Sequence, residues 1–205
     1  MKYTIEYNNH THKDFQEVWL IENDYLEPST ISSVEQVEYW DKINNDIHIF
    51  IKDNEVNKVV GEITLLPLNK IQFDNFMKNE LEDTQINSDS LLSYKKNMEC
   101  YLLFSAIAID KSYRKDRKVL SLLLEGLYDK IKKLQSLDIT LLNMCSEGQT
   151  KEGQNFIENF LNLKEKYVTE NNYKLYSFDN KSELEQWIKK FPIYIKNYNK
   201  KYKIN

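Results

Sequence analysis

Apolar and polar positions are most clearly separated between residues 101 and 134 of this 205-residue chain. Residues 102–109 are all apolar apart from Ser105, a pattern typical of a strand that is buried on both faces of a sheet. From Leu120 to Leu134 apolar residues recur at helical spacing, which predicts an amphipathic helix. We therefore expect a strand in the middle of the sheet, followed by a helix that packs on it.

The rest of the chain supplies further strands and helices. Residues 2–7 alternate with a period of two, which predicts a half-buried first strand. The other predicted strands are 46–52, 58–68, 138–145, 167–168 and 173–178. The other predicted helices are 15–26, 34–43, 73–81, 154–162 and a last one that begins near 182 and is interrupted at Pro192. Ser32 with Glu35, and Ser182 with Glu185, predict capping boxes at the starts of two helices.

The composition fits one globular domain, because 41% of the residues are hydrophobic. We expect residues 1–180 to form the domain and residues 181–205 to form a helical extension packed on it. The net charge of −4 gives no overall attraction to nucleic acid or to an anionic membrane. Neither a membrane-spanning apolar run nor the apolar core of a signal peptide is present, so we expect a cytoplasmic protein with no membrane partner.

A basic turn joins the predicted central strand to the helix that follows it. Residues 110–118 read DKSYRKDRK, with cationic side chains placed where the first turn of a helix presents N–H groups that lack intrahelical partners. Such a helix terminus attracts anions, and phosphate above all. The turn is therefore the best candidate anion site in the sequence.

At these residues the chain resembles the GCN5-related N-acetyltransferase (GNAT) superfamily. Its signature joins the end of a strand to an aromatic residue, then Arg or Gln, then x-x-Gly-x-Gly or Ala, and then a helix. Here residues 107–110 match the strand end, and Tyr113 and Arg114 match the next two positions. Arg117 and Val119 stand where the family has small residues. The resemblance implies an α/β (α+β) GNAT fold, a mixed twisted sheet of about six to seven strands flanked by helices.

The resemblance also implies acetyl-CoA as co-substrate, with its pyrophosphate on the basic turn and its pantetheine arm between the fourth and fifth strands where they splay apart. The candidate cofactor-binding residues are Ile107, Ala108, Ile109, Arg114, Lys115, Asp116, Arg117, Lys118, Val119, Leu120 and Ser146. Residues 69–97 are more than a simple link between strands needs, and on the family pattern they lie against the groove where an acceptor enters.

Three residues are candidates for catalysis. Glu62 is a carboxylate in an otherwise apolar strand and could act as a general base with a raised pKa, or it could point to solvent. Glu158 stands where the family often has a tyrosine that protonates the departing thiolate, with Tyr167 and Tyr173 near it in sequence. Asn143 is expected to border the splayed strands.

Two classes of function follow from the resemblance. The first is an N-acetyltransferase that moves an acetyl group from acetyl-CoA to a primary amine of a small molecule or peptide. The second is a catalytically degenerate GNAT-fold protein that binds CoA or a protein partner without transferring anything. We expect a monomer or a homodimer.

The remaining polar features point less directly to chemistry. His10 and His12 lack a third metal ligand nearby in sequence, so we expect no metal cofactor. His48 fits a partly exposed strand histidine and is a weaker acid or base candidate. Lysines alternate with aromatic residues in 189–203, which could bind nucleic acid, but a packing or dimer-forming extension with a solvated lysine face is the plainer interpretation. Cys100 and Cys145 are expected to stay reduced.

Overall fold

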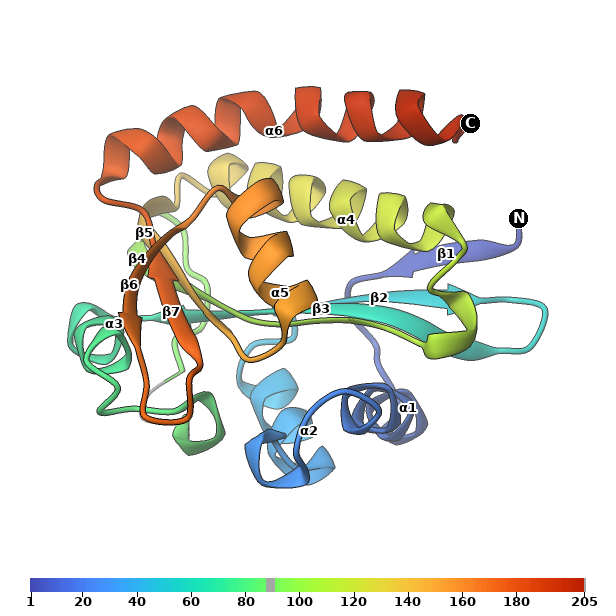
Figure 1. The fold of residues 1–205 in the computed structure, drawn as a ribbon, viewed down its shortest axis with the longest axis horizontal. Coiled ribbons are helices and arrows are strands. Elements are labelled where there is room, and N and C mark those ends of the chain that lie inside the picture. Colours follow the sequence, from blue (N-terminus) through green and yellow to red (C-terminus); the bar gives the residue numbers. More distant parts are fainter. Residues whose placement is uncertain (88–90, 205) are drawn as a thin grey trace.

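The computed structural model describes residues 1–87 and 91–204 and contains a seven-stranded sheet with helices on both faces (Figure 1). The strands are β1 (Tyr3–Glu6), β2 (His48–Asp53), β3 (Lys58–Leu68), β4 (Glu99–Ile109), β5 (Thr140–Gly148), β6 (Lys164–Val168) and β7 (Lys174–Ser177). The α-helices are α1 (His12–Asn23), α2 (Val34–Ile43), α3 (Lys70–Met77), α4 (Arg117–Ser136), α5 (Lys151–Phe156) and α6 (Lys181–Tyr202). Short helical turns are η1 (Pro28–Thr30), η2 (Asp83–Gln85), η3 (Lys111–Tyr113) and the π-helical η4 (Ile157–Leu161).

The strand predicted to be central is central. The strand order is β1-β2-β3-β4-β5-β7-β6, so β4 is the fourth of the seven strands. The pair β4 and β5 is parallel, whereas the other neighbouring strands are antiparallel. Parallel strands need a crossover connection, and α4 supplies it. These observations confirm the mixed sheet predicted from the sequence.

Helices α4 and α6 cover one face of the sheet, and α1 and α2 cover the other (Figure 1). The apolar stripe of α4 is buried at Leu123, Leu127, Ile131 and Leu134. Helix α6 lies over α4 and buries Trp187 and other side chains in the same core. None of the helices within residues 1–87 and 91–204 combines the length and apolar character that crossing a membrane requires.

Pro192 does not interrupt the last helix, and that prediction was wrong. Helix α6 continues through it to Tyr202, although a proline inside a helix costs about 3 kcal/mol. The packed face of the helix explains the difference, because Trp187, Phe191 and Ile195 are buried on both sides of the proline. Burying one large apolar side chain contributes roughly 2 to 3 kcal/mol, so the packing outweighs the local defect.

Neither α2 nor α6 begins with the capping box predicted for it, because a residue one or two positions away occupies the N-cap. The Ser33 hydroxyl, not that of Ser32, caps α2 by accepting from the Gln36 amide at 3.2 Å. Asn180, not Ser182, caps α6 by accepting from the Glu183 amide at 3.1 Å. In each case a neighbouring residue with an equally suitable side-chain oxygen has the extended backbone that the cap position requires.

Asparagine occupies most of the described left-handed backbone positions in this chain, which has only four glycines. Among the described residues, the non-glycine residues with positive φ are Asn9, Asn57, Asn79, Asn97, Asp138, Asn162, Asn172 and Lys203, and no described glycine has positive φ. Asn162 ends η4 with a φ of 58°, at the position where the resembled family has glycine. Asparagine tolerates this conformation better than most residues, so the helix can end there without glycine.

We predict that Gly126→Ala destabilises the protein although alanine favours helix. An added Cβ would lie 2.6 Å from Ile49 Cγ2 on β2, so α4 would have to move away from the sheet. We expect the free energy of unfolding to fall by about 1 to 3 kcal/mol, measured by chemical denaturation. Gly153→Ala is the control, because its added Cβ would meet only the Thr150 hydroxyl, at 3.1 Å. A variant at position 126 as stable as the wild type would contradict this account of the helix contact.

Candidate functional site

Strands β4 and β5 pair along about half of β4 and most of β5, and then part. Their register runs from Glu99 opposite Thr140 to Phe104 opposite Ser146, and it ends there. At the last pair the Ser146 hydroxyl donates to the Phe104 carbonyl at 2.8 Å. Beyond this point β4 continues along β3, while β5 pairs with β7. The parting leaves an opening in the middle of the sheet.

Ser105 lies at the start of this opening as the extra residue of a β-bulge. Leu65 of β3 pairs with Phe104, and Thr64 pairs with Ala106, so Ser105 has no partner in the register. A bulge shifts the alternation of side chains by one position and bends the strand. The single polar residue in the predicted strand therefore marks the place where β4 changes direction.

A cavity of about 970 Å³ passes through the opening. On one side of the sheet it is lined by Val18 and Glu22 of α1 and by Trp40 of α2. On the other side Leu120 of α4 and Phe156 of α5 line it. Because these helices cover opposite faces of the sheet, the cavity connects the two faces (Figure 1).

Most of the predicted cofactor-binding residues line this cavity. They are Ile107, Ala108, Ile109, Arg114, Asp116, Arg117, Leu120 and Ser146. Lys115, Lys118 and Val119 are not among the lining residues. The Val119 side chain is buried and packs against Gly61, where an added Cβ would lie 3.0 Å from Val119 Cγ1. It therefore points into the core and not toward the turn.

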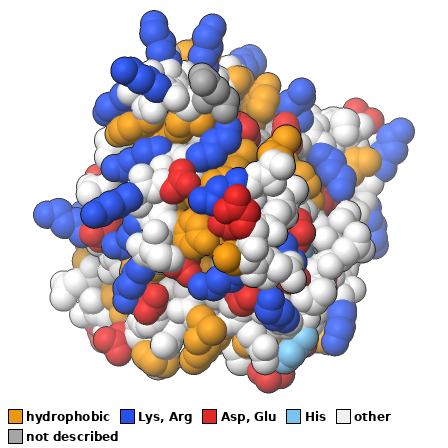
Figure 2. All heavy atoms as spheres, turned by 90° about the vertical axis from the view of Figure 1, so that its right-hand side faces the viewer, with side chains coloured by type: hydrophobic (Ala, Val, Ile, Leu, Met, Phe, Trp, Pro, Cys, Tyr) orange, Lys and Arg blue, Asp and Glu red, His pale blue; other side chains and the backbone are white. Residues whose placement is uncertain are grey.

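Two guanidinium groups stand at the α4 end of the cavity. Arg114 lies over the ring of Tyr25, 4.0 Å from its centre, and Arg117 lies over the ring of Tyr202 at the end of α6, at 5.1 Å. Both arginines are exposed. Figure 2 shows Lys and Arg side chains gathered over the C-terminal end of α6 at the top of this side of the molecule. This end of the cavity is suited to an anion.

The start of α4 already carries a carboxylate. Asp116 caps the helix by accepting from the Lys118 amide at 3.0 Å, and its second oxygen accepts from the Tyr3 hydroxyl at 2.5 Å. An anionic cap satisfies part of the helix terminus that would otherwise attract phosphate. An anion at this end of the cavity would therefore depend on the arginine side chains more than on free backbone amides.

Glu62 is buried and does not point to solvent. Only 1% of its surface is exposed, and its Oε1 atom has no hydrogen-bond partner among the described residues. Burial, and next the neighbouring carboxyl of Glu22, raise the pKa of Glu62 well above its usual range. Burial raises the pKa of Glu22 to about 7, and the charge of Asp83 adds to the effect. The two carboxyl groups can therefore hold and release a proton near neutral pH.

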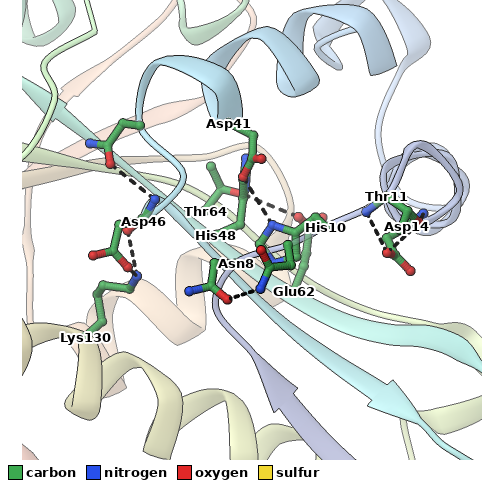
Figure 3. Close-up of polar contacts among 12 residues, drawn as sticks. Asn8, His10, Thr11, Asp14, Asp41, Asp46, His48, Glu62, Thr64 and Lys130 are labelled. Atoms are coloured by element: carbon green, nitrogen blue, oxygen red, sulfur yellow. Dashed lines mark hydrogen bonds and ion pairs between the residues drawn. The ribbon is translucent and has the colours of Figure 1, made fainter.

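A short polar chain continues from Glu62 through Thr64, which also lines the cavity, to His48, which does not. Thr64 Oγ1 lies 3.5 Å from Glu62 Oε2 and 2.9 Å from His48 Nδ1. Figure 3 shows Glu62, Thr64, His48 and His10 next to one another. His48 is fully buried, so the prediction of partial exposure was wrong. Burial lowers its pKa well below the ordinary value, which leaves the ring neutral.

Two further carboxylates border the cavity, and the sequence analysis missed both of them together with Glu22. Asp83, in η2, accepts from the Ser105 hydroxyl at 2.9 Å. Burial raises its pKa. Glu147, on β5, accepts from Gln149 Nε2 at 2.7 Å, and burial raises its pKa to about 7. These residues come from separate elements with no shared motif, so no signal in the sequence connects them.

The segment between β3 and β4 lies against the cavity, through Phe76, Asn79, Glu82, Asp83 and Thr84. Part of the predicted insertion, residues 88–90, lies outside the described residues. Within the ranges that the structure describes, no group of three or more His, Cys, Asp and Glu side chains is arranged to hold a metal ion.

Two predicted catalytic residues lie elsewhere. Neither Glu158 nor Asn143 is among the residues that line the cavity. Glu158 is exposed and accepts from the Tyr176 hydroxyl at 2.8 Å, whereas Asn143 donates to the Phe178 carbonyl at 3.1 Å. Two tyrosines do line the cavity. Tyr25 donates its hydroxyl to the Ile109 carbonyl at 2.7 Å, and Tyr173 lies in the turn between β6 and β7.

We predict that the free energy of unfolding falls between about pH 5 and 8 because of the Glu22 and Glu62 pair. Their folded-state pKa values are raised, so the stability they contribute is full below the unfolded pKa and is lost as pH rises through the folded pKa. Glu62→Gln should therefore be more stable than the wild type by about 1 to 3 kcal/mol at pH 8 and nearly equal at pH 5.

Denaturant titrations at both pH values measure this difference, with Glu185→Gln on the exposed face of α6 as the control. If Glu62→Gln changed the free energy of unfolding equally at both pH values, the raised pKa values of the Glu22 and Glu62 pair would be contradicted.

Comparison with known proteins identifies this arrangement at the level of fold. The sequence matches no protein-family model and no curated protein. Among solved structures, the NatC complex bound to Gag peptide and CoA has a TM-score of 0.56 at 11% identity, covering 86% of this chain and 96% of that chain. An N-acetyltransferase from Staphylococcus aureus Mu50 has a TM-score of 0.54 at 13% identity, with 87% and 99% covered. Ard1 from Thermoplasma volcanium has 0.52 at 14%, with 86% and 95% covered. The chain therefore has the GNAT fold that its sequence resembles.

Proposed function

We propose that this protein is an acetyl-CoA-dependent N-acetyltransferase that acts on a primary amine. The observation that carries the proposal is the cavity that crosses the sheet where β4 and β5 part. One end of it has two exposed guanidinium groups, and the other has the buried carboxyl group of Glu62 and the half-buried one of Glu22, both with raised pKa values. Acetyl transfer needs both environments, one for the phosphates of CoA and one for the amine.

The residues present fit CoA, with one departure from the family pattern. Arg114 and Arg117 would hold the phosphates by charge-assisted hydrogen bonds. The edge of β4 at residues 107–109 would hold the pantetheine arm, since its pairing with β5 has ended, although the Ile109 carbonyl already accepts a hydrogen bond from the Tyr25 hydroxyl. Asp116 repels a phosphate placed directly on the helix terminus, so the phosphates are expected nearer the guanidinium groups. That the NatC complex of similar fold was solved with CoA supports CoA as a ligand.

The acidic end of the cavity suits the amine. An amine arrives protonated and becomes a nucleophile only after it loses a proton. The Glu22 and Glu62 pair can take that proton, because burial raises the pKa values of the two carboxyl groups toward the pKa of the amine. The amine nitrogen then forms a bond to the thioester carbonyl carbon, the carbon–sulfur bond breaks, and the thiolate takes a proton. Tyr173, which lines the cavity, is the proposed donor of that proton.

A second candidate function is binding of CoA or of a protein partner without transfer. The observation that favours it is the Asp116 carboxylate on the helix terminus, together with Glu158 at the position of the family's tyrosine and outside the cavity. The two functions differ in whether an amine causes release of CoA. Binding of CoA does not distinguish the two functions, because both include it.

We predict that acetyl-CoA raises the melting temperature by roughly 5 to 10 °C at a hundred times its dissociation constant. CoA should give a similar shift, and a nucleotide without pantetheine should give little, because the arm fills the opening between β4 and β5.

Replacing Arg114 and Arg117 together by alanine should weaken acetyl-CoA binding by roughly 2 to 4 kcal/mol, or about 30- to 700-fold. Lys189→Ala with Lys190→Ala on the exposed face of α6 is the matched control. No shift at millimolar acetyl-CoA would overturn the proposal.

We predict that Glu62→Gln abolishes amine-dependent release of CoA, because glutamine cannot accept the proton. His48→Asn should retain it, since His48 does not line the cavity. Thiol release from acetyl-CoA over a panel of primary amines measures both variants, and acetyl-CoA melting shifts verify that each still binds the co-substrate. Full activity of Glu62→Gln would assign the base to another residue.

A further inference from the structure

We infer that the acceptor is a linear aliphatic amine with two or more ammonium groups, held by the row of carboxylates from Glu62 to Glu147. The inference rests on the proposed function, because it names the substrate class of the same cavity. It goes further in fixing the charge, the number of charged groups and the shape of the acceptor.

The charge of the lining is the first observation. Among the described residues, nine acidic side chains line the cavity: Glu22, Asp24, Glu62, Glu82, Asp83, Asp116, Glu147, Glu152 and Glu170. The only basic side chains among the lining residues that the structure describes are Arg114 and Arg117, both at the α4 end. A cavity of this composition attracts cations along its length and repels anions everywhere except at the arginines. The occupant of the acidic part is therefore cationic.

The second observation is the unpartnered oxygen of Glu62. The side chain is 1% exposed and lines the cavity, and its Oε1 atom has no hydrogen-bond partner in the described part of the chain. The neighbouring Glu22 carboxyl can donate to Glu62 only while one of the two groups holds a proton, so an ionised pair leaves this buried oxygen without a donor. A buried acceptor in that state is rare in folded proteins, because it loses its hydrogen bond to water and gains nothing in return. A donor group of a ligand would satisfy it.

The carboxylates form a row and not a single cluster. Glu62 lies on β3 and Glu147 on β5, and β4 runs between these two strands. Asp83 of η2 accepts from the Ser105 hydroxyl of β4 at 2.9 Å, so it lies at the middle strand. Besides burial, the charge of Asp83 raises the pKa values of Glu22 and Glu147. One ammonium group could satisfy one end of this row only. A second ammonium group on the same molecule would satisfy the other end.

Apolar side chains make up part of the wall near the charged groups. Val18, Trp40, Phe76 and Leu103 line the cavity and offer no hydrogen bond except from the indole of Trp40, which already donates to the Ile86 carbonyl at 2.8 Å. Of the hydroxyl groups that also line the cavity, that of Ser105 already donates to Asp83 at 2.9 Å, and that of Thr64 lies 2.9 Å from His48 Nδ1. Such walls suit a chain of methylene groups and not a ring of hydroxyl groups, whose hydrogen bonds with water would be lost without replacement. The chemistry therefore favours an aliphatic polyamine over an amino sugar.

The binding test uses the full chain without acetyl-CoA, so it does not depend on transfer. Calorimetric titration compares diaminobutane and spermidine with n-butylamine, which has the same stem as diaminobutane and only one ammonium group. The diamine should bind at least about tenfold more tightly than the monoamine, since it gains a second charged pair. Binding should tighten from pH 6 to pH 8 and release protons, because a cation binds the ionised carboxyl groups more tightly than the protonated ones. The pKa values of Glu22 and Glu147 are raised to about 7, and those of Glu62 and Asp83 are also raised. The charge of Glu82 adds to the effect of burial at Glu147.

Two variants locate the site. Asp83→Asn and Glu62→Gln should each weaken spermidine binding by about tenfold or more, and the advantage of diaminobutane over n-butylamine should shrink most in Asp83→Asn. Glu185→Gln on α6 should leave binding unchanged, because it is exposed and outside the cavity. Melting curves of each variant verify that it is folded.

The outcomes separate this inference from the proposed function. Equal affinity for diaminobutane and n-butylamine, or tighter binding of kanamycin or of Mg²⁺ than of spermidine, would overturn the inference and leave the transferase proposal standing. Tight spermidine binding that needs Asp83 and Glu62, without release of CoA from acetyl-CoA, would support a polyamine-binding site in the cavity and overturn the transferase proposal. Binding of spermidine together with its acetylation would support both.

Discussion

The structure depends on one constraint, the parting of two parallel strands in the middle of the sheet. Strand β4 remains paired with β3 and β5 turns to β7, so neither strand is left without a partner when they separate after Phe104 and Ser146. The bulge at Ser105 provides the bend. Without this separation the side chains on the two faces of the sheet would belong to two unconnected surfaces. With it, they line a single cavity.

Charge is distributed unevenly along that cavity. Two arginines occupy one end and a row of carboxyl groups the other, with the sheet opening between them. Burying carboxyl groups together without a cation is unfavourable, and the raised pKa values of Glu22, Glu62 and Glu147 express that cost. Perturbed pKa values of this kind cluster at sites where binding or chemistry relieves the unfavourable charge. A ligand that brings positive charge would relieve it here.

Three positions at which the resembled family has small residues carry larger side chains here. Asn162 ends η4 in the left-handed conformation. Val119 lies in the first turn of α4, and the space for it comes from Gly61 on the facing strand. Arg117 places a guanidinium group on a flexible side chain where the family has glycine. The fold is preserved at all three positions, and under the proposed function the Arg117 side chain would hold phosphate in place of a close approach by the backbone.

The sequence by itself determined the elements and their order. Strong periodicity identified the central strand and the helix after it, and the pattern at residues 107–119 indicated the fold, because these signals are local and repeat every two or every three to four residues. It also singled out Glu62, a lone charge in an apolar strand, without deciding whether that charge was buried. Only the tertiary structure placed Glu22 beside it, brought Asp83 and Glu147 into the same cavity, and left Asn143 and Glu158 outside that cavity. Residues from α1, η2, β3 and β5 meet through packing, and packing between distant segments leaves no periodic signal in the chain.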